Sequence, residues 1–361
     1  MLNGIRIVEI EGLGPGPFAA MHLADLGADV IVIHRKSSSG SITTDKSLLD
    51  RGKRSIALDL KDPNDIEIAL GIIENSDGLI EGFRPGVMER LGLGPEVCQA
   101  RNPALVYGRM TGWGQKGPRA QQAGHDLNYI ATSGALWYSS VPGDAPMTPP
   151  TLVGDIGGGA NYLVIGMLAG ILGAKSSGKG CVVDASIVDG SAHMMNLLMA
   201  VKQSGQFQET RGQSLLDGPH WCRTYTCQDG KFVTVQCLEP KFYDVFLDLL
   251  NLSEDQNFAK QYDKTKWSEQ TEKLSAIFAA QPSTHWDTLF SGSDACVAIA
   301  KSPLEALDDP HMKSRDIWQS LDGDLQASPA PRFDGDVKSI SAAPARDQHR
   351  DEILRDIFGR D

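Results

Sequence analysis

Short apolar runs alternate with helix-like segments over the first 110 residues, and this alternation constrains the fold more than any other feature. Residues 5–9 alternate as a strand, residues 18–26 read as a helix behind Pro17, and residues 30–33 form a continuous apolar run. Continuous apolar runs are typical of strands buried on both faces of a parallel sheet. The pattern recurs in predicted strands at 55–60, 78–81, 104–107 and 181–184, and in a predicted helix at 63–75. We therefore expect an α/β fold with a large Rossmann-like domain built on a parallel sheet.

The second half of the chain changes character. An apolar, glycine-rich stretch at 162–174 predicts a buried helix, since a bilayer needs roughly 20 residues to span. A long helix is predicted at 189–203, followed by a polar connector, a hairpin at 224–235 and further helices. We expect a large α/β domain at 1–190 that is completed by residues 317–361. A linker helix and connector at 191–214 and a small α+β domain at 215–310 complete the chain.

Charge and composition exclude several classes of partner. The net charge of −12 argues against nucleic acid or an anionic membrane. Met1 leads directly into a predicted strand, so we expect no export signal and a cytoplasmic protein. The six cysteines form no Cys-x-x-Cys pair, so we expect reduced thiols and no metal site.

Two basic clusters nevertheless stand in the acidic chain. Residues 84–119 carry six basic and two acidic side chains, and Arg51, Lys53 and Arg54 form a second group. Each cluster is compatible with a solvated surface, but together they favour a phosphate-bearing ligand. A Gly-x-Gly-x-Gly run at 12–16 suggests a dinucleotide site, but proline stands at 17 instead of the third glycine of that fingerprint. We interpret the run as a tight turn between a strand and a helix.

Three positions combine an acid or a base with unusual neighbours. His125 stands in a Gly-His-Asp sequence, and histidine side chains exchange protons near neutral pH. On its own it reads better as an ordinary histidine, with Asp126 as a helix N-cap. Asp155 precedes three glycines and is either an N-cap at a helix start or a carboxylate beside a closely approaching ligand. Glu239 follows a strand in an aromatic setting and is weak evidence alone.

Motifs along nearly the whole chain add to these residues. They lie at 9–16, 25–30, 81–92, 111–118, 122–126, 178–180, 183–185, 188–190, 238–243 and 329–333. With them the chain resembles the α-methylacyl-CoA racemases, within the broader type III, formyl-CoA-transferase-like, CoA-transferase family. Gly-His-Asp at 124–126 combined with Glu-Pro-Lys-Phe at 239–242 is specific to the racemase branch.

The resemblance implies an isomerase that interconverts (R)- and (S)-2-methylacyl-CoA thioesters through an enolate. One base removes the proton on carbon 2, and a second group returns it from the opposite face. The resemblance assigns these roles to His125 and Asp155, with Glu239 orienting the histidine. Main-chain N–H groups around 124–126 and at the helix start after Asp155 are expected to stabilise the enolate oxygen. Because a capping Asp155 would be a weak base, we expect burial to offset any capping.

The resemblance also implies where the substrate binds. CoA is part of the substrate, and no separate cofactor is expected. The residues expected to contact it are Arg35, Leu58, Asp59, Leu60, Lys61, Gly82, Phe83, Arg84, Arg90, Gly124, Asp126, Leu127, Asn128 and Tyr129, with Arg54 as a further candidate. The family forms an interlocked homodimer, so Glu239 is expected to come from the partner subunit.

Two alternatives stay open. In a CoA-transferase, Asp155 would instead be a nucleophile that forms a mixed anhydride with the acyl group. In a protein that binds CoA esters without turnover, Asp155 would act neither as an acid/base group nor as a nucleophile. The entrance to the small domain, residues 216–222, is one residue shorter than the racemase pattern and carries His220 and Cys222. The identity of the acyl group therefore stays open.

Overall fold

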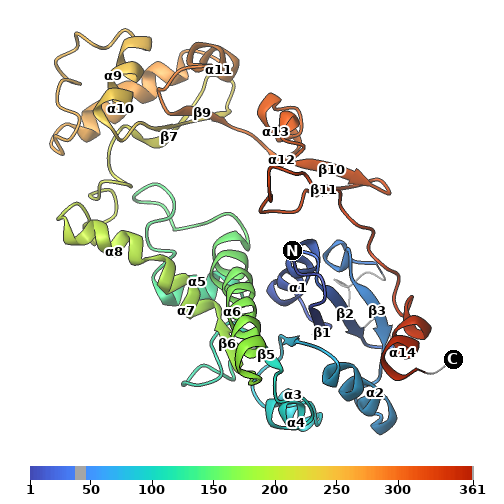
Figure 1. The fold of residues 1–361 in the computed structure, drawn as a ribbon. Coiled ribbons are helices and arrows are strands. Elements are labelled where there is room, and N and C mark those ends of the chain that lie inside the picture. Colours follow the sequence, from blue (N-terminus) through green and yellow to red (C-terminus); the bar gives the residue numbers. More distant parts are fainter. Residues whose placement is uncertain (37–45, 360–361) are drawn as a thin grey trace. The chain divides into compact units, whose positions relative to one another are not determined.

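The computed structural model describes residues 1–36 and 46–359, which form two compact units (Figure 1). Unit 1 contains Met1–Leu136, Thr148–Met194 and the C-terminal segment from Pro310, and unit 2 contains Trp137–Met147 and Met195–Asp309. Residues 37–45 and 360–361 fall within the ranges expected for the large domain and lie outside the described residues. Each unit is considered by itself below.

Unit 1 is built on a six-stranded sheet in the order β3-β2-β1-β4-β5-β6. All neighbouring strands are parallel, so the predicted parallel sheet is confirmed. The order of the strands reverses between β1 and β4, and in such sheets ligands bind at the carboxyl ends of the strands beside this reversal. The strands are β1 (Arg6–Ile10), β2 (Asp29–His34), β3 (Arg54–Ala57), β4 (Gly78–Glu81), β5 (Val106–Thr111) and β6 (Val182–Ser186).

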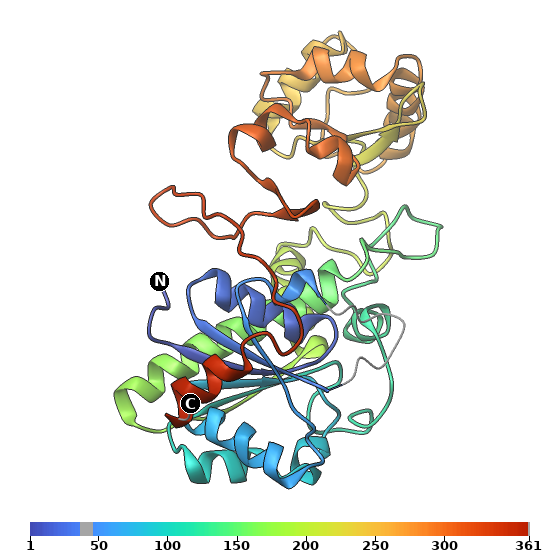
Figure 2. The ribbon, with the colours of Figure 1, turned by 90° about the vertical axis from the view of Figure 1, so that its right-hand side faces the viewer.

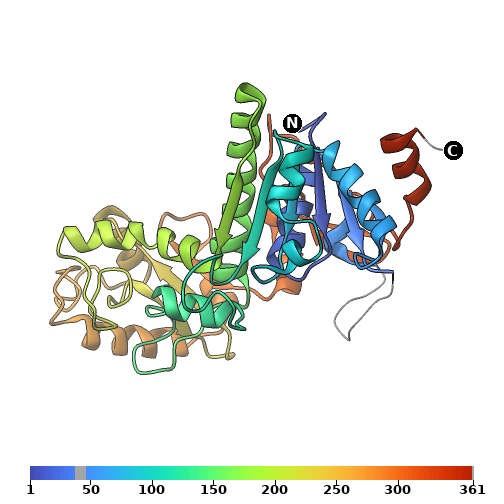
Figure 3. The same ribbon diagram turned by 90° about the horizontal axis from the view of Figure 1, so that it is seen from below.

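Helices cover both faces of this sheet. Side chains alternate between the faces along each strand, so Ile7 packs in a core with α1 and α6 whereas Val8 packs in a second core with α2 and α14. Figure 3 shows α6 beside β5 and β6. The helices are α1 (Pro15–Asp25), α2 (Pro63–Glu74), α3 (Val87–Arg90), α4 (Pro95–Arg101), α5 (Asp126–Ser133), α6 (Asn161–Ser177), α7 (Ile187–Met194), α13 (Pro310–Ser314) and α14 (Arg350–Phe358), with a 3-10 turn at Leu48–Asp50.

The helical segment around Asp155 differs from the prediction. A π-helix, Leu152–Ala160, continues without a break into α6, so the run covers 26 residues instead of about 13. By length and composition alone this run is long enough to cross a membrane. Its residues Leu163 and Met167 are fully buried in the core beside the sheet, whereas Leu172 on another face is exposed. The run is therefore packed in this structure as one wall of the unit 1 core.

The prediction of one continuous helix at 189–203 is wrong. The structure has two helices there, α7 and α8 (Asn196–Gln203), which are separated at Met195 and fall in different units. α7 packs closely on the π-helix, since a Cβ on Gly190 would collide with the carbonyl of Gly158. α8 has no buried residue, so it is not held by packing of this kind.

The C-terminal segment adds a hairpin that the sequence did not predict, β10 (Trp318–Leu321) and β11 (Asp324–Ala327).

Unit 2 contains the predicted hairpin, β7 (Cys222–Thr226) and β8 (Phe232–Gln236), extended by β9 (Val297–Ala300). Its remaining helices are α9 (Pro240–Leu249), α10 (Trp267–Ala279), α11 (Ser283–Phe290) and α12 (Pro303–Ala306). His220 lies in the aromatic core, fully buried, with Nε2 2.8 Å from the hydroxyl of Tyr243. Burial lowers its pKa to about 3, so His220 is a neutral structural residue.

Candidate active site

A cavity of about 210 Å³ lies at the carboxyl edge of the sheet of unit 1. Its wall includes the glycine-rich turn at residues 12–17, the ends of β4 and β5, and both His125 and Asp155. As predicted, this run is the tight turn between a strand and a helix, β1 and α1. Gly14 has φ +70°, and a Cβ there would lie 3.9 Å from Oδ2 of Asp155. The turn therefore forms the side of the cavity that faces the Asp155 carboxylate.

His125 is held at the start of α5. It takes the N-cap position with an extended backbone, and its N–H donates to Oδ1 of Asn128 at 3.0 Å. The expectation that Asp126 would be the N-cap is wrong, because Asp126 is already the first residue of the helix. The imidazole of His125 is exposed and lines the cavity. The capping arrangement thus fixes the backbone of His125 and leaves its side chain directed to the site.

Asp155 does not cap a helix either. It lies inside the π-helix Leu152–Ala160, which is a rare element that is frequent at functional sites. Its N–H donates to Oδ1 of Asp126 at 2.9 Å. The expected enolate-stabilising helix start after Asp155 is therefore absent, since the N–H of Ile156 is already bonded to the carbonyl of Thr151. The start of α5, directly after His125, does supply N–H groups of that kind beside the cavity.

The surroundings of Asp155 change its acidity. Burial raises the pKa of its carboxyl, the nearby charge of Asp126 raises it further, and His125 lowers it, with a resulting pKa of about 6. Burial thus has the effect that we expected from the chemistry of a general base. An aspartate with this pKa is present in both protonation states near neutral pH, as a group must be that both removes and returns protons.

A second cavity, of about 180 Å³, continues from the first. The two share Gly82, Thr111, Gly112, His125 and Tyr129 in their walls, and the second also contains Phe83 and Arg84. The ring of Tyr129 stands edge-on to Trp113 at 4.8 Å between centroids, and its hydroxyl donates to the carbonyl of Gly124. The two adjoining cavities therefore have Asp155 in the wall of one, Arg84 in the wall of the other and His125 in both.

Not all of the expected substrate-contacting residues line these cavities. Gly82, Phe83, Arg84, Gly124 and Tyr129 do so. Other members of the expected set lie outside both cavity walls; they are Arg35, Leu58, Asp59, Leu60, Lys61, Arg90, Asp126, Leu127 and Asn128. Their contacts with a substrate stay predictions.

The second basic cluster is not a phosphate site, and that expectation is wrong. Arg51 pairs with Asp25 at 2.5 Å, and Lys53 is fully buried with Nζ 2.5 Å from Oε2 of Glu9. Arg54 begins β3, at the opposite end of the strand from the cavities, and pairs with Asp29. The charges of these residues are visible in the sequence, but the carboxylates that neutralise them are not.

Two functional candidates were missed. Glu81 ends β4, is fully buried and lines the first cavity. Its Oε2 accepts the N–H of Phe83 at 2.7 Å, and its Oε1 accepts Nε of Arg109 at 2.9 Å. Arg109 also pairs with Glu89 on α3. One arginine therefore holds the end of β4, the turn after it and α3 together. A signal existed in the sequence, since Glu81 and Arg109 carry opposite charges near the ends of adjacent strands and are register partners.

Glu239 lies in unit 2. It takes the N-cap position of α9, where its carbonyl accepts the N–H groups of Phe242 and Tyr243 at 3.0 Å, and the residue is exposed. Its expected interaction with His125 of unit 1 stays a prediction.

Comparisons with known proteins are consistent along the chain. The family described as CoA-transferase family III matches residues 2–350. The human protein "Alpha-methylacyl-CoA racemase" is 37% identical over 365 residues, which cover 100% of this chain and 94% of that protein. The "Acetyl-CoA:oxalate CoA-transferase" of Acetobacter aceti is 28% identical and covers 96% of this chain and 93% of that protein. A crystal structure of a CaiB/BaiF family protein from Brucella suis has a TM-score of 0.80 at 24% identity, covering 98% of each chain, which shows a shared fold.

Proposed function

The chain belongs to CoA-transferase family III, and we infer that it is an isomerase that racemises 2-methylacyl-CoA thioesters. The observation that carries this inference is one cavity that holds both His125 and an Asp155 carboxyl with a pKa raised to about 6. Racemisation needs two groups that each donate and accept a proton near neutral pH. The full-length similarity to racemases supports the same assignment.

The proposed reaction moves one proton and is balanced within the site. The thioester carbonyl acidifies carbon 2, so the unprotonated member of the pair, His125 or Asp155, removes the α-proton. The electrons of the C–H bond form a planar enolate. The protonated member then delivers its proton to the opposite face, and the two groups have exchanged protonation states. The reverse reaction starts from this exchanged state, which is why both directions use the same pair.

In this proposal the start of α5 stabilises the negative charge that develops on the enolate oxygen. The first N–H groups of a helix have no acceptor within the helix, and here they belong to Asp126 and Leu127, directly after His125. Donors aimed at a developing enolate oxygen contribute a large share of catalysis in such reactions. We assign the carbonyl end of the thioester to this helix start, and the second cavity, with Arg84, to the pantetheine and phosphate end.

We also propose that the enzyme is a homodimer in which the partner subunit's Glu239 orients His125. Besides the family resemblance, exposed apolar side chains support an interface. Ile165 and Leu172 on α6 are 61% and 75% exposed, and Leu197 on α8 is 72% exposed. Scattered exposed apolar residues are ordinary, but clusters on a helix are typical of contact surfaces.

Incubation of one enantiomer of a 2-methylacyl-CoA in heavy water tests the proposed function. Racemisation predicts that deuterium appears at carbon 2 as optical purity is lost. Exchange of the acyl group onto a free acid, with a covalent enzyme adduct trapped by hydroxylamine, would instead establish a CoA-transferase with Asp155 as the nucleophile. Binding of the thioester without either reaction would establish a binding protein.

A further inference from the structure

The C-terminal segment covers the free edge of the sheet. β3 is the last strand in the order of the sheet, so one side of its main chain has no neighbouring strand. Residues 347–350 take that place. The N–H of His349 donates to the carbonyl of Ser55 at 2.9 Å, and the N–H of Asp347 donates to the Ser55 hydroxyl at 3.0 Å. The N–H of Ala57 donates to Oδ1 of Asp347 at 2.7 Å, and Arg350 donates to the carbonyl of Ala57. α14 follows and packs on β3 and α2 (Figure 2).

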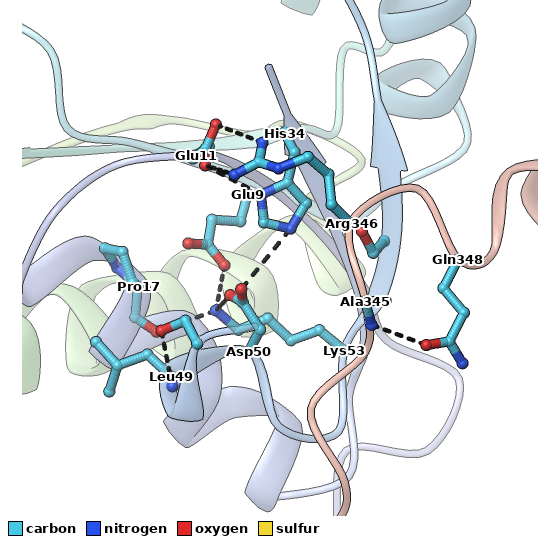
Figure 4. Close-up of polar contacts among 12 residues, drawn as sticks. Glu9, Glu11, Pro17, His34, Leu49, Asp50, Lys53, Ala345, Arg346 and Gln348 are labelled. Carbon is cyan, nitrogen blue, oxygen red and sulfur yellow. Dashed lines mark hydrogen bonds and ion pairs between the residues drawn. The ribbon is translucent and has the colours of Figure 1, made fainter. Parts of the chain in front are cut away.

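The preceding residue of the segment reaches the neighbouring strand. Nη1 of Arg346 donates to the carbonyl of Arg35 at 2.7 Å. Figure 4 shows the second contact of Arg346, in which Nη2 lies 2.9 Å from Oε1 of Glu11. Oε2 of Glu11 in turn accepts the N–H of Arg35 at 2.8 Å. Glu11, Arg35 and Arg346 thus form a closed ring that fixes the main chain at Arg35 on both sides.

This ring is charged under physiological conditions. Burial raises the pKa of Glu11, but hydrogen bonds from His34, Arg346 and the Arg35 N–H outweigh burial and lower the pKa to about 2. The carboxylate is therefore ionised throughout the neutral range. Charge-assisted hydrogen bonds of this kind are roughly twice as strong as neutral ones.

Adjacent residues of one segment therefore hold the carboxyl ends of two strands. Arg346 fixes Arg35 after β2, and Asp347 fixes Ala57 directly before Leu58–Lys61 after β3. A further link joins the segments that follow β2 and β3, since Lys36 pairs with Asp65 at 2.6 Å and Asp65 accepts the N–H of Asp59 at 2.7 Å. Arg35, Asp59 and Lys61 are exposed at this edge, where a parallel sheet binds its ligand.

From this arrangement we propose that Arg346 and Asp347 are positioning residues for the nucleotide half of the CoA thioester. The proposal rests on the proposed function, because it takes Arg35 and residues 58–61 as the nucleotide-binding segments. Neither Arg346 nor Asp347 touches the reacting atoms. They set the separation between two segments that bind the same ligand, and a preorganised site loses less entropy when it binds.

The variants Arg346→Gln and Arg346→Lys test this role, with Arg355→Gln as the control. The lysine keeps the charge but not the planar fork that bridges Glu11 and Arg35. Arg355 lies on α14 in the same segment, and among the described residues its side chain donates to the carbonyl of Asp351 within that helix. Each protein is assayed for α-proton exchange with a 2-methylacyl-CoA and with the same acyl group on pantetheine, which lacks the nucleotide.

We expect both Arg346 variants to raise KM for the CoA thioester about tenfold, which corresponds to the loss of one charge-assisted hydrogen bond. kcat should stay within about twofold, and kcat/KM for the pantetheine thioester should equal that of the wild type. An equal loss of kcat/KM with both substrates would overturn the positioning role and indicate a general contribution of Arg346 to folding. An unchanged KM for the CoA thioester in both variants would also overturn the positioning role.

If the proposed racemase function is wrong, the positioning role of Arg346 can still be tested separately. If the wild-type protein exchanges no α-proton, calorimetric titration of the same proteins with free CoA still tests Arg346. A weaker affinity in the Arg346 variants, with the affinity of Arg355→Gln unchanged, supports the positioning role whatever the reaction. Equal CoA affinity in all four proteins refutes it.

Discussion

Asp126 accepts the main-chain N–H of Asp155 at 2.9 Å, which places two carboxyl groups side by side at the candidate site. The other oxygen of Asp126, Oδ2, is buried and has no hydrogen-bond partner among the described residues. Asp126 therefore has two effects on Asp155: it fixes the backbone of that residue, and its negative charge raises the pKa of the neighbouring carboxyl. The two effects are separable by substitution.

Asp126→Asn keeps the carbonyl-type acceptor and removes the charge. Because the charge of Asp126 raises the pKa of Asp155, its loss should lower that pKa. We expect the acidic limb of the kcat/KM profile for α-proton exchange to move by about 0.5 to 1 unit to lower pH. Glu67→Gln, which removes an exposed carboxylate that pairs with Arg101, should leave the profile in place. An unshifted limb in Asp126→Asn would show that another group controls it.

Asp155 should also reduce stability at neutral and alkaline pH. Its folded-state pKa of about 6 lies above the ordinary value of 3.8, so the ionised form is disfavoured in the folded protein. This cost is fully present above pH 6 and is lost as the pH falls towards 4. Asp155→Asn should therefore be more stable than the wild type at pH 8, by about 1 to 2 kcal/mol after allowance for solvent screening, and inactive in exchange. Denaturant unfolding at pH 8, 6 and 4.5 measures the trend, and a gain that does not change with pH would contradict it.

The parallel sheet was predictable because its signal is local. The run at 30–33 is continuously apolar, as is typical of a strand buried on both faces, and residues 5–9 alternate as a strand. The hairpin of unit 2 was predictable for the same reason, from Asp229-Gly230 between two alternating runs. The β10–β11 hairpin was missed because its strands are short and polar.

The ion pairs of the second basic cluster were not predictable from the sequence. Arg54 and Lys53 read as phosphate ligands, but their partners Asp29 and Glu9 stand 25 and 44 positions away. From the sequence, the glycines after Asp155 suggest room for a closely approaching ligand, whereas in the structure Gly158 packs against Ser191 of α7. Both errors have one cause, which is that a sequence shows residue types without the tertiary contacts that use them.

The network around Arg109 makes a prediction about stability. Arg109→Met leaves the fully buried carboxylate of Glu81 without its counter-charge, and we expect a loss of about 3 kcal/mol or more. Glu81→Gln leaves Arg109 paired with the partly exposed Glu89, so the loss should be smaller, about 1 kcal/mol. Arg101→Met removes an exposed pair with Glu67 and should cost less than about 1 kcal/mol. Denaturant unfolding ranks the three, and equal losses for the two arginines would argue against a buried network.

The proposed sharing of a site between subunits has a direct test. His125→Ala and Glu239→Ala homodimers should each lose most activity, as is usual for a general base and for the group that orients it. If a partner subunit supplies Glu239, a mixed dimer contains one site with both changes and one intact site, so mixing after subunit exchange should restore about a quarter of wild-type activity. No restoration, despite mixed dimers in native mass spectra, would place both residues of a site in one chain.

Gly154 tests whether the contact between α5 and the π-helix sets the catalytic geometry. A Cβ at this position would lie 2.4 Å from Oδ1 of Asp126 and 2.8 Å from Cγ2 of Ile130, so Gly154→Ala must displace the Asp126 carboxylate that holds the N–H of Asp155, or α5 itself. Because a displacement of about 1 Å in a catalytic group can cost about 100-fold in rate, we expect kcat to fall by roughly that factor. Gly173 lies in the same helical run with nothing within 4 Å of its Cβ position. Gly173→Ala should therefore keep full activity and gain about 0.5 to 1 kcal/mol in stability. Exchange assays and thermal unfolding of the two variants check this, and an active Gly154→Ala would show that the site does not depend on this contact.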